Sequence, residues 1–500
     1  MAVHPIKQLA GQTVIYGFSS IVGRLLNYLL VPLYTHLIFE TQEYGVVTLM
    51  YSYVAFLLVI LTYGMETAFF RFHENNPDNR STVFSTSLFS VLFTSTLFIL
   101  LTSFLKQPIA GLLGFGGHPE YIVWLGIIVG LDAVAAIPFA RLRAENKPLK
   151  FAVIKFINIG VNIGLNLFFL LLCPWIMEKG PQGLRPFVDL IYDPSIGVGY
   201  VFISNLVATS VTLLLLLPVM LRSNFGFSAG LLRKMLIYAL PLMVAGLSGV
   251  INESLDKILL KYILPEDVAM SQVGIYGACY KISIMMTIFI QAFRFAAEPF
   301  FFSQAANKNA PELYAQVMKY FVIACLFIFL GIMLFMDVVQ HFIGAAYREG
   351  LGVVPILLLA NMFLGIYFNL SIWYKLTGQT RYGAFIAIIG AIITIGLNFW
   401  WIPLIGYFGS AWATLVCYLC MTALSFAWGQ KKYPIPYEIK TIMLFVFSAI
   451  AIYLLSLLTH DLNSLLKYTS ALLLLVIFAF SVLMIDATLL KQLKRTFFNK

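Results

Sequence analysis

The sequence predicts an all-α polytopic membrane protein with about 14 transmembrane helices. Three observations predict this fold class. Of the 500 residues, 61% are hydrophobic and only 11% are charged, and the mean hydropathy is +0.90. Charged residues make up about 25% of a soluble domain, so this composition excludes one. The apolar runs are continuous, as in membrane helices, whereas the strands of a membrane barrel would alternate.

The apolar runs define the spans in chain order. A bilayer core requires about 20 apolar residues per helix, and such runs cover residues 11–38, 46–70, 82–105, 121–140, 151–173, 198–221, 236–260, 273–302, 320–336, 353–374, 382–402, 405–428, 441–458 and 468–485. The first run is about 28 residues long and no small-residue cleavage site follows it, so we expect a retained helix rather than a signal peptide. The longest segment between spans, Pro174 to Gly197, is too short for a soluble catalytic domain.

Basic residues are distributed unequally between the two sides of these spans. Twenty-two lysines and arginines fall on the side of the N-terminus, and six fall on the other side, namely Lys106, Lys179, Arg185, Lys261, Arg348 and Lys467. Cytosolic loops carry the excess of Lys and Arg, so both termini are expected in the cytosol. The net charge of +10 then reflects topology and lipid headgroups rather than a nucleic-acid partner.

The sequence lacks the motifs of ATP-driven pumps and common hydrolases. It contains no phosphate-binding Gly-Lys-Ser/Thr loop, no HExxH and no Ser/His/Asp set in one loop. The five cysteines lie in or beside spans, where core packing explains them better than a metal or redox site. We therefore expect neither an ATP-driven pump nor an enzyme.

A short internal repeat divides the chain. The pattern NIGLN at Asn162–Asn166 recurs as TIGLN at Thr394–Asn398, 232 residues later, and the segment Glu43–Val46 before span 2 resembles Gln272–Ile275 before span 8. A chance match in a chain rich in Leu, Ile and Gly is the alternative. Duplicated halves are common in transporters, and six spans per half make the two copies parallel. The repeat predicts an N-terminal lobe (residues 1–222, spans 1 to 6), a C-terminal lobe (223–432, spans 7 to 12) and two extra spans with a basic cytosolic tail (433–500).

Ten charged residues lie within the predicted spans, and eight of them fall in spans 1, 2, 7 and 8. A charge at mid-bilayer costs about 2.5 to 3.5 kcal/mol, so it normally faces a cavity or a partner. Under the repeat, these four spans are equivalent helices of the two halves and would surround one central cavity. The ten are Arg24, Glu66, Asp132, Lys155, Glu253, Asp256, Lys257, Lys281, Arg294 and Glu298.

Arg24 and Lys281 are the first candidates for binding an anion. Arg24 follows roughly 13 residues of its span, about 20 Å at 1.5 Å per residue, so neither membrane surface is close, and Asn27 extends its polar face. Lys281 has no acidic neighbour three or four residues away. Arginine offers a phosphate a bidentate fork and lysine a point charge. The alternative is an interhelical ion pair with Glu66 or Asp256.

Helical spacing suggests two further ion pairs. Glu253 and Lys257, and likewise Arg294 and Glu298, are four residues apart and so share a helix face. If these pairs do not form, Lys257 and Arg294 are further substrate contacts, and Glu253 and Glu298 are counter-ions.

The remaining acids have two interpretations. Glu66 and Asp256 could bind a coupling Na⁺ or proton instead of pairing with a base. Asp132 in span 4 is either a proton or cation site or an interhelical hydrogen-bond partner. Asn158, Asn162 and Asn166 recur every four residues along span 5, which indicates helix packing or the lining of a cavity.

At this point the chain resembles a known family. The 14 spans, the duplicated halves with two extra helices, and the turn Arg143–Lys147 (Arg-Ala-Glu-Asn-Lys) matched by Lys375–Gln379 (Lys-Leu-Thr-Gly-Gln) are similar to the Wzx-type O-antigen flippases. These are polysaccharide transporters of the multidrug/oligosaccharidyl-lipid/polysaccharide superfamily. The resemblance implies two lobes that give alternating access to a cationic central cavity. It also implies transfer of an undecaprenyl-pyrophosphate-linked oligosaccharide from the cytosolic to the outer leaflet, with Arg24 and Lys281 holding the pyrophosphate or acidic sugars.

The resemblance also implies a cellular setting. The protein is expected in a bacterial inner membrane, serving cell-surface polysaccharide or lipopolysaccharide biosynthesis. Its expected partners are the lipid-linked oligosaccharide, membrane lipids, and a glycan polymerase and chain-length regulator, with no nucleic acid. No cofactor is expected beyond a coupling Na⁺ or H⁺.

Three alternatives stay open, and one feature departs from the family. Drug and cation antiporters of the same superfamily usually have twelve spans, and lipid II flippases typically carry an acid beside the arginine of span 1, where Leu25 stands here. A membrane glycan polymerase or ligase would carry a large polar outer loop. The departure is that the eight charges of spans 1, 2, 7 and 8 sum to zero, whereas an anionic cargo favours a positive excess.

Overall fold

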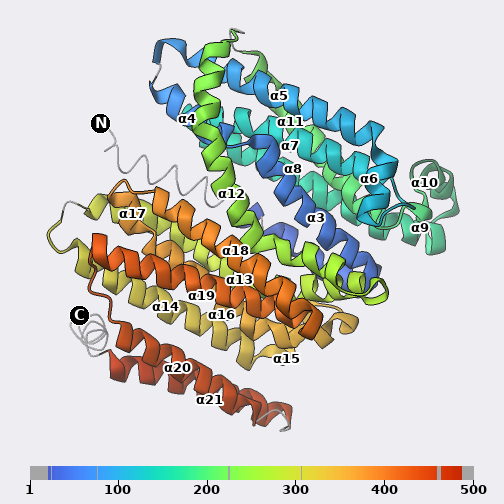
Figure 1. Cartoon of the computed structure of the whole chain (residues 1–500). Coiled ribbons are helices and arrows are strands. Elements are labelled where there is room, and N and C mark those ends of the chain that lie inside the picture. The colour runs from blue at the N-terminus through green and yellow to red at the C-terminus, as the bar shows by residue number, and fades with distance from the viewer. Residues whose placement is uncertain are drawn as a thin grey trace. The chain divides into compact units, whose positions relative to one another are not determined.

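Helices form all the regular structure of the residues that the computed structural model describes, which are 21–23, 25–75, 77–222, 226–305, 307–458 and 463–486. Within these residues, 14 helical segments are long and apolar enough to cross a membrane. They follow one another in the predicted order (Figure 1). The predicted all-α polytopic fold with 14 transmembrane helices is therefore confirmed.

The spans of the first predicted half consist of one or more helical pieces each. In order they are α2 (Leu30–Leu33) with η1 (Tyr34–Ile38), α3 (Thr41–Thr62) with α4 (Met65–Asn75), α5 (Arg80–Phe104), α7 (Glu120–Ala144), α8 (Pro148–Leu167) with η3 (Phe168–Leu172) and α9 (Cys173–Lys179), and α11 (Gly199–Leu221). Two short helices, α6 (Lys106–Leu113) and α10 (Arg185–Ile191), lie between spans.

The remaining spans include the two longest helices of the described chain. In order they are α12 (Ala229–Ile263), α13 (Glu266–Gln304), α14 (Ala310–Leu334), η7 (Ala345–Val353) with α16 (Val354–Leu370) and α17 (Ile372–Leu376), α18 (Arg381–Ile405), α19 (Tyr407–Lys432), α20 (Ile439–Leu457) and α21 (Ser464–Ile485). A short helix, α15 (Met336–Val339), follows α14.

The helices pack into two compact units. Unit 1 comprises the described residues of Met1–Ala278 and Ala387–Ser410, and unit 2 those of Cys279–Ile386 and Ala411–Lys500. In unit 1, α7 packs against α5, α11 and α3. In unit 2, α14 packs against α16, α20 and α21. The lobes that the repeat predicts, 1–222 and 223–432, stay a prediction.

Span 2 of unit 1 bends where α3 ends and α4 begins. Tyr63 and Gly64 have φ angles of 33° and 72°, a left-handed conformation that glycine adopts without strain. A Cβ atom on Gly64 would lie 2.6 Å from the carbonyl oxygen of Ala239 in α12. Glycine therefore permits both the bend and the close approach of α12, and α4 starts directly beyond it with Glu66 in its first turn.

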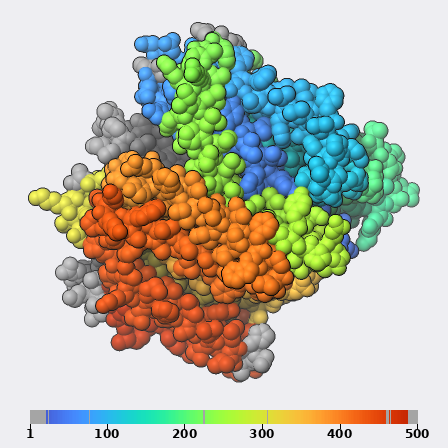
Figure 2. Space-filling model, viewed as in Figure 1, coloured from blue at the N-terminus to red at the C-terminus, as the bar shows by residue number. Residues whose placement is uncertain are grey.

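In unit 2, ion pairs join the two extra spans to α14 and to the short helix α15 that follows it. Lys319, whose side chain is 3% exposed, lies 2.9 Å from Glu438 before α20 and 2.8 Å from Asp486 after α21. Near the opposite end of α21, Lys467 pairs with Asp337 in α15. The side chains of α20 and α21, at the red end of the colour scale, pack side by side (Figure 2).

Candidate functional site

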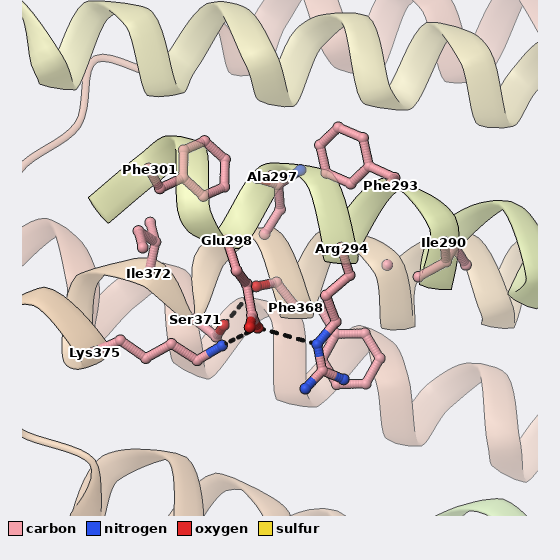
Figure 3. Close-up of a pocket in the computed structure, with 12 residues that line it drawn as sticks. Ile290, Phe293, Arg294, Ala297, Glu298, Phe301, Phe368, Ser371, Ile372 and Lys375 are labelled. Atoms are coloured by element: carbon pink, nitrogen blue, oxygen red, sulfur yellow. Dashed lines mark hydrogen bonds and ion pairs between the residues drawn. The ribbon is translucent and has the colours of Figure 1, made fainter. Parts of the chain in front are cut away.

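A small pocket lies in unit 2 between α13, α16 and α17 (Figure 3). Its wall is mainly apolar and aromatic, with Phe293, Phe301 and Phe368 among its residues, and three charged side chains converge in it. These are Arg294, Glu298 and Lys375. Concave, largely apolar pockets with a few convergent polar groups are the usual form of ligand sites.

The charged side chains come together because of helical spacing and a break in span 10. Arg294 and Glu298 are one turn apart on α13, and Arg294 Nε donates to Glu298 Oε1 at 3.1 Å. Span 10 is interrupted at Ser371, whose hydroxyl donates to the carbonyl oxygen of Phe368. Beyond the break, α17 brings Lys375 to the same carboxylate oxygen. Two bases share one acid, so the pocket carries one excess positive charge.

Two hydrogen-bonding groups at the pocket have capacity left for a ligand. The Arg294 guanidinium lies 4.6 Å from the centre of the Phe368 ring, and its terminal nitrogens point away from Glu298 (Figure 3). Asn369 also lines the pocket. It is 5% exposed, and its Nδ2 is buried without a hydrogen-bond partner among the described residues. Both groups are donors, so the pocket suits an acceptor-rich, anionic group.

The predicted ion pair of Lys257 has a different partner. Lys257 Nζ lies 3.0 Å from Asp256 Oδ1 and donates to the backbone oxygen of Glu253 at 3.1 Å. The second oxygen of Asp256 accepts from the hydroxyl of Tyr276 in α13 at 2.6 Å. The expected partnership of Lys257 with the Glu253 carboxylate is thus corrected, because Tyr276 and Lys257 together compensate the charge of the buried Asp256.

Glu66 and Asp132 both find partners inside unit 1. Glu66 in α4 forms an ion pair with Arg143 at the end of α7. Asp132 accepts a hydrogen bond from Thr209 in α11 and interacts electrostatically with Lys155 in α8. Both interpretations of Asp132, a proton or cation site and an interhelical hydrogen bond, stay predictions.

Equivalent helices of the predicted halves make the same asparagine contacts. Asn166 Nδ2 donates to the backbone oxygen of Asn162 at 2.8 Å, and Asn398 Nδ2 donates to that of Thr394 at 2.7 Å. Asn162 also donates to Asn27 of span 1 at 3.3 Å. In the same way, Thr394 donates to Asn252 of span 7 at 3.2 Å. All these residues lie in unit 1, and the matched contacts are what a duplicated half would produce.

The remaining predicted positions are spread along the helices. Arg24 lies outside the described residues. Lys281 is half-buried in α13, about 20 Å along the helix from Arg294 at 1.5 Å per residue. Asn27 is exposed and accepts the bond from Asn162. The structure thus gathers Arg294 and Glu298 into one pocket and places Lys281 well away from it.

Sequence reasoning missed three residues of these sites. Lys375 lies one residue beyond predicted span 10. It and Arg143 were used for the topology and as the first residues of the two matched turns, but not as site residues, and Asn369 is one polar residue in an apolar run. A signal for two of them was present: Arg143 and Lys375 are 232 residues apart, as are Glu66 and Glu298. Including Arg143 and Lys375 turns the zero charge of the eight residues into an excess of two positive charges.

Comparisons with known proteins match one family model and several solved structures. Residues 38–177 match a family model described as polysaccharide biosynthesis protein, and no curated protein sequence matches the chain. A structure of the lipid II flippase MurJ in an inward closed conformation matches with a TM-score of 0.71 and 12% identity, over 94% of this chain and 99% of that one. An inward-facing multidrug resistance MATE family transporter of the MOP superfamily matches with a TM-score of 0.65 and 14% identity, over 84% and 97%. A mutant of the Vibrio cholerae MATE transporter VcmN matches with a TM-score of 0.56 and 15% identity, over 85% and 95%.

The fold is therefore the one that these transporter and flippase structures share. The family model, which covers residues 38–177, agrees with the polysaccharide branch that the sequence resembles. The resemblance inferred from the sequence is confirmed.

Proposed function

We propose that this protein is a flippase that moves a polyprenyl-pyrophosphate-linked oligosaccharide from the cytosolic to the outer leaflet of a bacterial inner membrane. Its product would feed the synthesis of a cell-surface polysaccharide such as lipopolysaccharide O-antigen. The match to a polysaccharide biosynthesis family supports the substrate class. The 14-span fold shared with a lipid II flippase supports the type of transport.

The observation that carries the proposal is the excess positive charge of the pocket in unit 2. The ion pair Glu298–Lys375 resembles Glu66–Arg143 of unit 1, but only the former is joined by Arg294. The residue 232 positions before Arg294 is the uncharged Thr62. An arginine whose terminal nitrogens have no hydrogen-bond partner among the described residues suits a pyrophosphate, which presents several acceptor oxygens. Arg294 therefore replaces Arg24 and Lys281 as the first pyrophosphate contact.

The other predicted residues keep supporting roles in this proposal. The roles of Arg24, Asn27 and Lys281 as substrate contacts stay predictions, and Lys257 forms an ion pair with Asp256. Asp132 is the acid we propose for coupling to Na⁺ or H⁺, because it is buried near the Thr209 hydroxyl and the Lys155 ammonium group. A glycan polymerase and a chain-length regulator would act on the product, and both termini would lie in the cytosol.

A close helix contact supports alternating access. A Cβ atom on Gly45 would lie 2.1 Å from the backbone oxygen of Met270, and one on Gly274 would lie 1.9 Å from that of Thr41. Thr41 and Ser271 share a hydrogen bond of 2.7 Å. These residues begin spans 2 and 8, which the repeat makes equivalent, at the predicted outer face. We assign this contact to the closed outer end of the transport path.

Reconstitution of the purified protein in proteoliposomes tests the proposal. Three cargoes are compared in parallel: a lipid-linked oligosaccharide, lipid II and an organic cation. We expect transfer of the lipid-linked oligosaccharide well above protein-free vesicles and above the other two. Preferred transfer of lipid II or export of the cation would assign the chain to another branch. Lengthening of glycan chains without transfer would indicate the polymerase alternative.

A further inference from the structure

The segment between spans 5 and 6 presents large apolar side chains at its surface. Trp175 is 52% exposed, Phe187 60% and Leu190 82%. They belong to α9 and α10, which lie at the rim of unit 1 (Figure 1). The sequence places this segment outside the predicted spans, where exposed apolar side chains would face water. Several large apolar side chains exposed on one short segment indicate an interaction surface.

The segment is folded and fixed to the ends of spans 5 and 6. Cys173, Ile176 and Val188 form a small core between α9 and α10. The Tyr192 ring stacks on Tyr200 at 5.1 Å, and the Tyr200 hydroxyl accepts a hydrogen bond of 2.7 Å from the backbone of Asp193. The exposed side chains are therefore held in place on the outside of a packed core.

The length of span 5 places this segment at the membrane boundary. Helix runs without interruption through α8, η3 and α9, from Pro148 to Lys179. Cys173, against which α10 packs, follows Pro148 by 25 residues, about 38 Å at 1.5 Å per residue. The hydrocarbon core is about 30 Å thick and the whole bilayer about 40 to 45 Å. A helix that starts at one surface thus brings α10 to the headgroup region of the other.

The exposed apolar surface is continuous with the lipid-facing side of span 5. Leu167, Leu171 and Leu172 are exposed along α8 and η3, and Trp175 continues their line into α9. The same segment also carries charged residues. Among them is Arg185, whose buried Nε has no hydrogen-bond partner among the described residues. Aromatic and aliphatic side chains beside basic ones are typical of helices that lie in a membrane interface.

We propose that residues 173–191, which we call the foot, form a lipid-binding surface. Trp175, Phe187 and Leu190 enter the boundary between headgroups and acyl chains of the predicted outer leaflet, and Lys179 and Arg185 meet lipid phosphates. On α10, Phe187, Leu190 and Ile191 share one side of the helix, whereas Asp189 projects from the opposite side. The partner is the bilayer itself, whatever cargo the protein transports.

Fluorescence quenching in nanodiscs that hold one full-length copy tests the foot. The variants L190C and D189C are each labelled with an environment-sensitive fluorophore, and the parent protein gives the background from native cysteines, four of which are buried. Phosphatidylcholine with a spin label near the headgroup serves as the lipid quencher, and iodide serves as the aqueous quencher. Both substituted positions are exposed, so the protein should fold.

We expect the lipid quencher to reduce the fluorescence at position 190 at least about twofold more than at position 189, with the reverse order for iodide. F187C provides a second reporter on the apolar side and should behave like L190C. If iodide quenches all three labels alike and the lipid quencher none, the foot is an aqueous loop and the proposal fails. If positions 187 and 190 are shielded from both quenchers, protein covers the surface, which also overturns the proposal. None of these outcomes depends on transport activity.

Discussion

Glu298 pairs with Lys375 across 77 residues of sequence, and the same pairing occurs between Glu66 and Arg143, also 77 residues apart. The second pair follows the first by 232 residues, the offset that separates NIGLN from TIGLN. Each pair joins the predicted second span of a half to the end of its fourth. The two halves differ in Arg294, which joins only the later pair. This difference is the basis of the proposed pyrophosphate site.

Exchanging the charges of the first pair should preserve it. In Arg143→Glu, two acids face each other, and we expect a small loss of thermal stability and of transport. Glu66→Arg combined with Arg143→Glu should recover part of both. We expect a coupling free energy of about 0.2 to 1 kcal/mol, because both side chains are just over one-third exposed. Thermal unfolding of the two single variants and the double variant measures this coupling. Strictly additive effects would argue against the pair.

Adding a methyl group at Gly45 should disturb the contact between spans 2 and 8. The new Cβ would lie 2.1 Å from a backbone oxygen, and overpacking of this kind costs about 1 to 3 kcal/mol. We expect Gly45→Ala to lower the melting temperature and to increase labelling of a cysteine at Thr41 from the outer side. Gly160→Ala is the matched control, since nothing lies within 4 Å of its added Cβ. Equal melting temperatures for both variants would contradict the assignment of this contact.

Removing Lys319 should release the two extra spans. Lys319→Ala leaves the Asp486 side chain, 3% exposed, without its base, and breaking a buried pair costs about 3 to 5 kcal/mol. We expect a lower melting temperature and faster proteolysis between spans 12 and 13. Lys308→Ala, which removes an exposed lysine nearby in sequence, should leave both unchanged. If the melting temperature and the proteolysis rate of Lys319→Ala stay unchanged, apolar packing alone holds α20 and α21.

Hydropathy and spacing predicted the fold well, because a membrane helix is defined by local composition. The apolar runs predicted all 14 spans, and helical periodicity predicted the pairing of Arg294 with Glu298. Lys375 could not be placed this way. Its approach to Glu298 depends on the break at Ser371 and on the packing of α17 near α13, which are tertiary features.

The partner of Lys257 escaped prediction for a related reason. Side chains four residues apart share a helix face, whereas adjacent residues do not. This rule favoured Glu253 over Asp256 as the partner of Lys257. The structure instead fixes Asp256 through Tyr276 from another helix, and the flexible lysine side chain bends back to it. The residue spacing along one helix cannot predict a contact with a residue of another helix.

The most direct test of the account is transport of a lipid-linked oligosaccharide by Arg294→Ala in proteoliposomes, beside Arg294→Lys and Lys234→Ala. Lys234 is an exposed lysine outside the pocket, so its variant removes the same charge elsewhere. Loss of a charge-assisted hydrogen bond costs about 1.5 to 3 kcal/mol, so Arg294→Ala should transport at least about tenfold more slowly. Arg294→Lys should retain part of the rate and Lys234→Ala all of it. Equal rates for Arg294→Ala and Lys234→Ala would contradict the proposed pyrophosphate site.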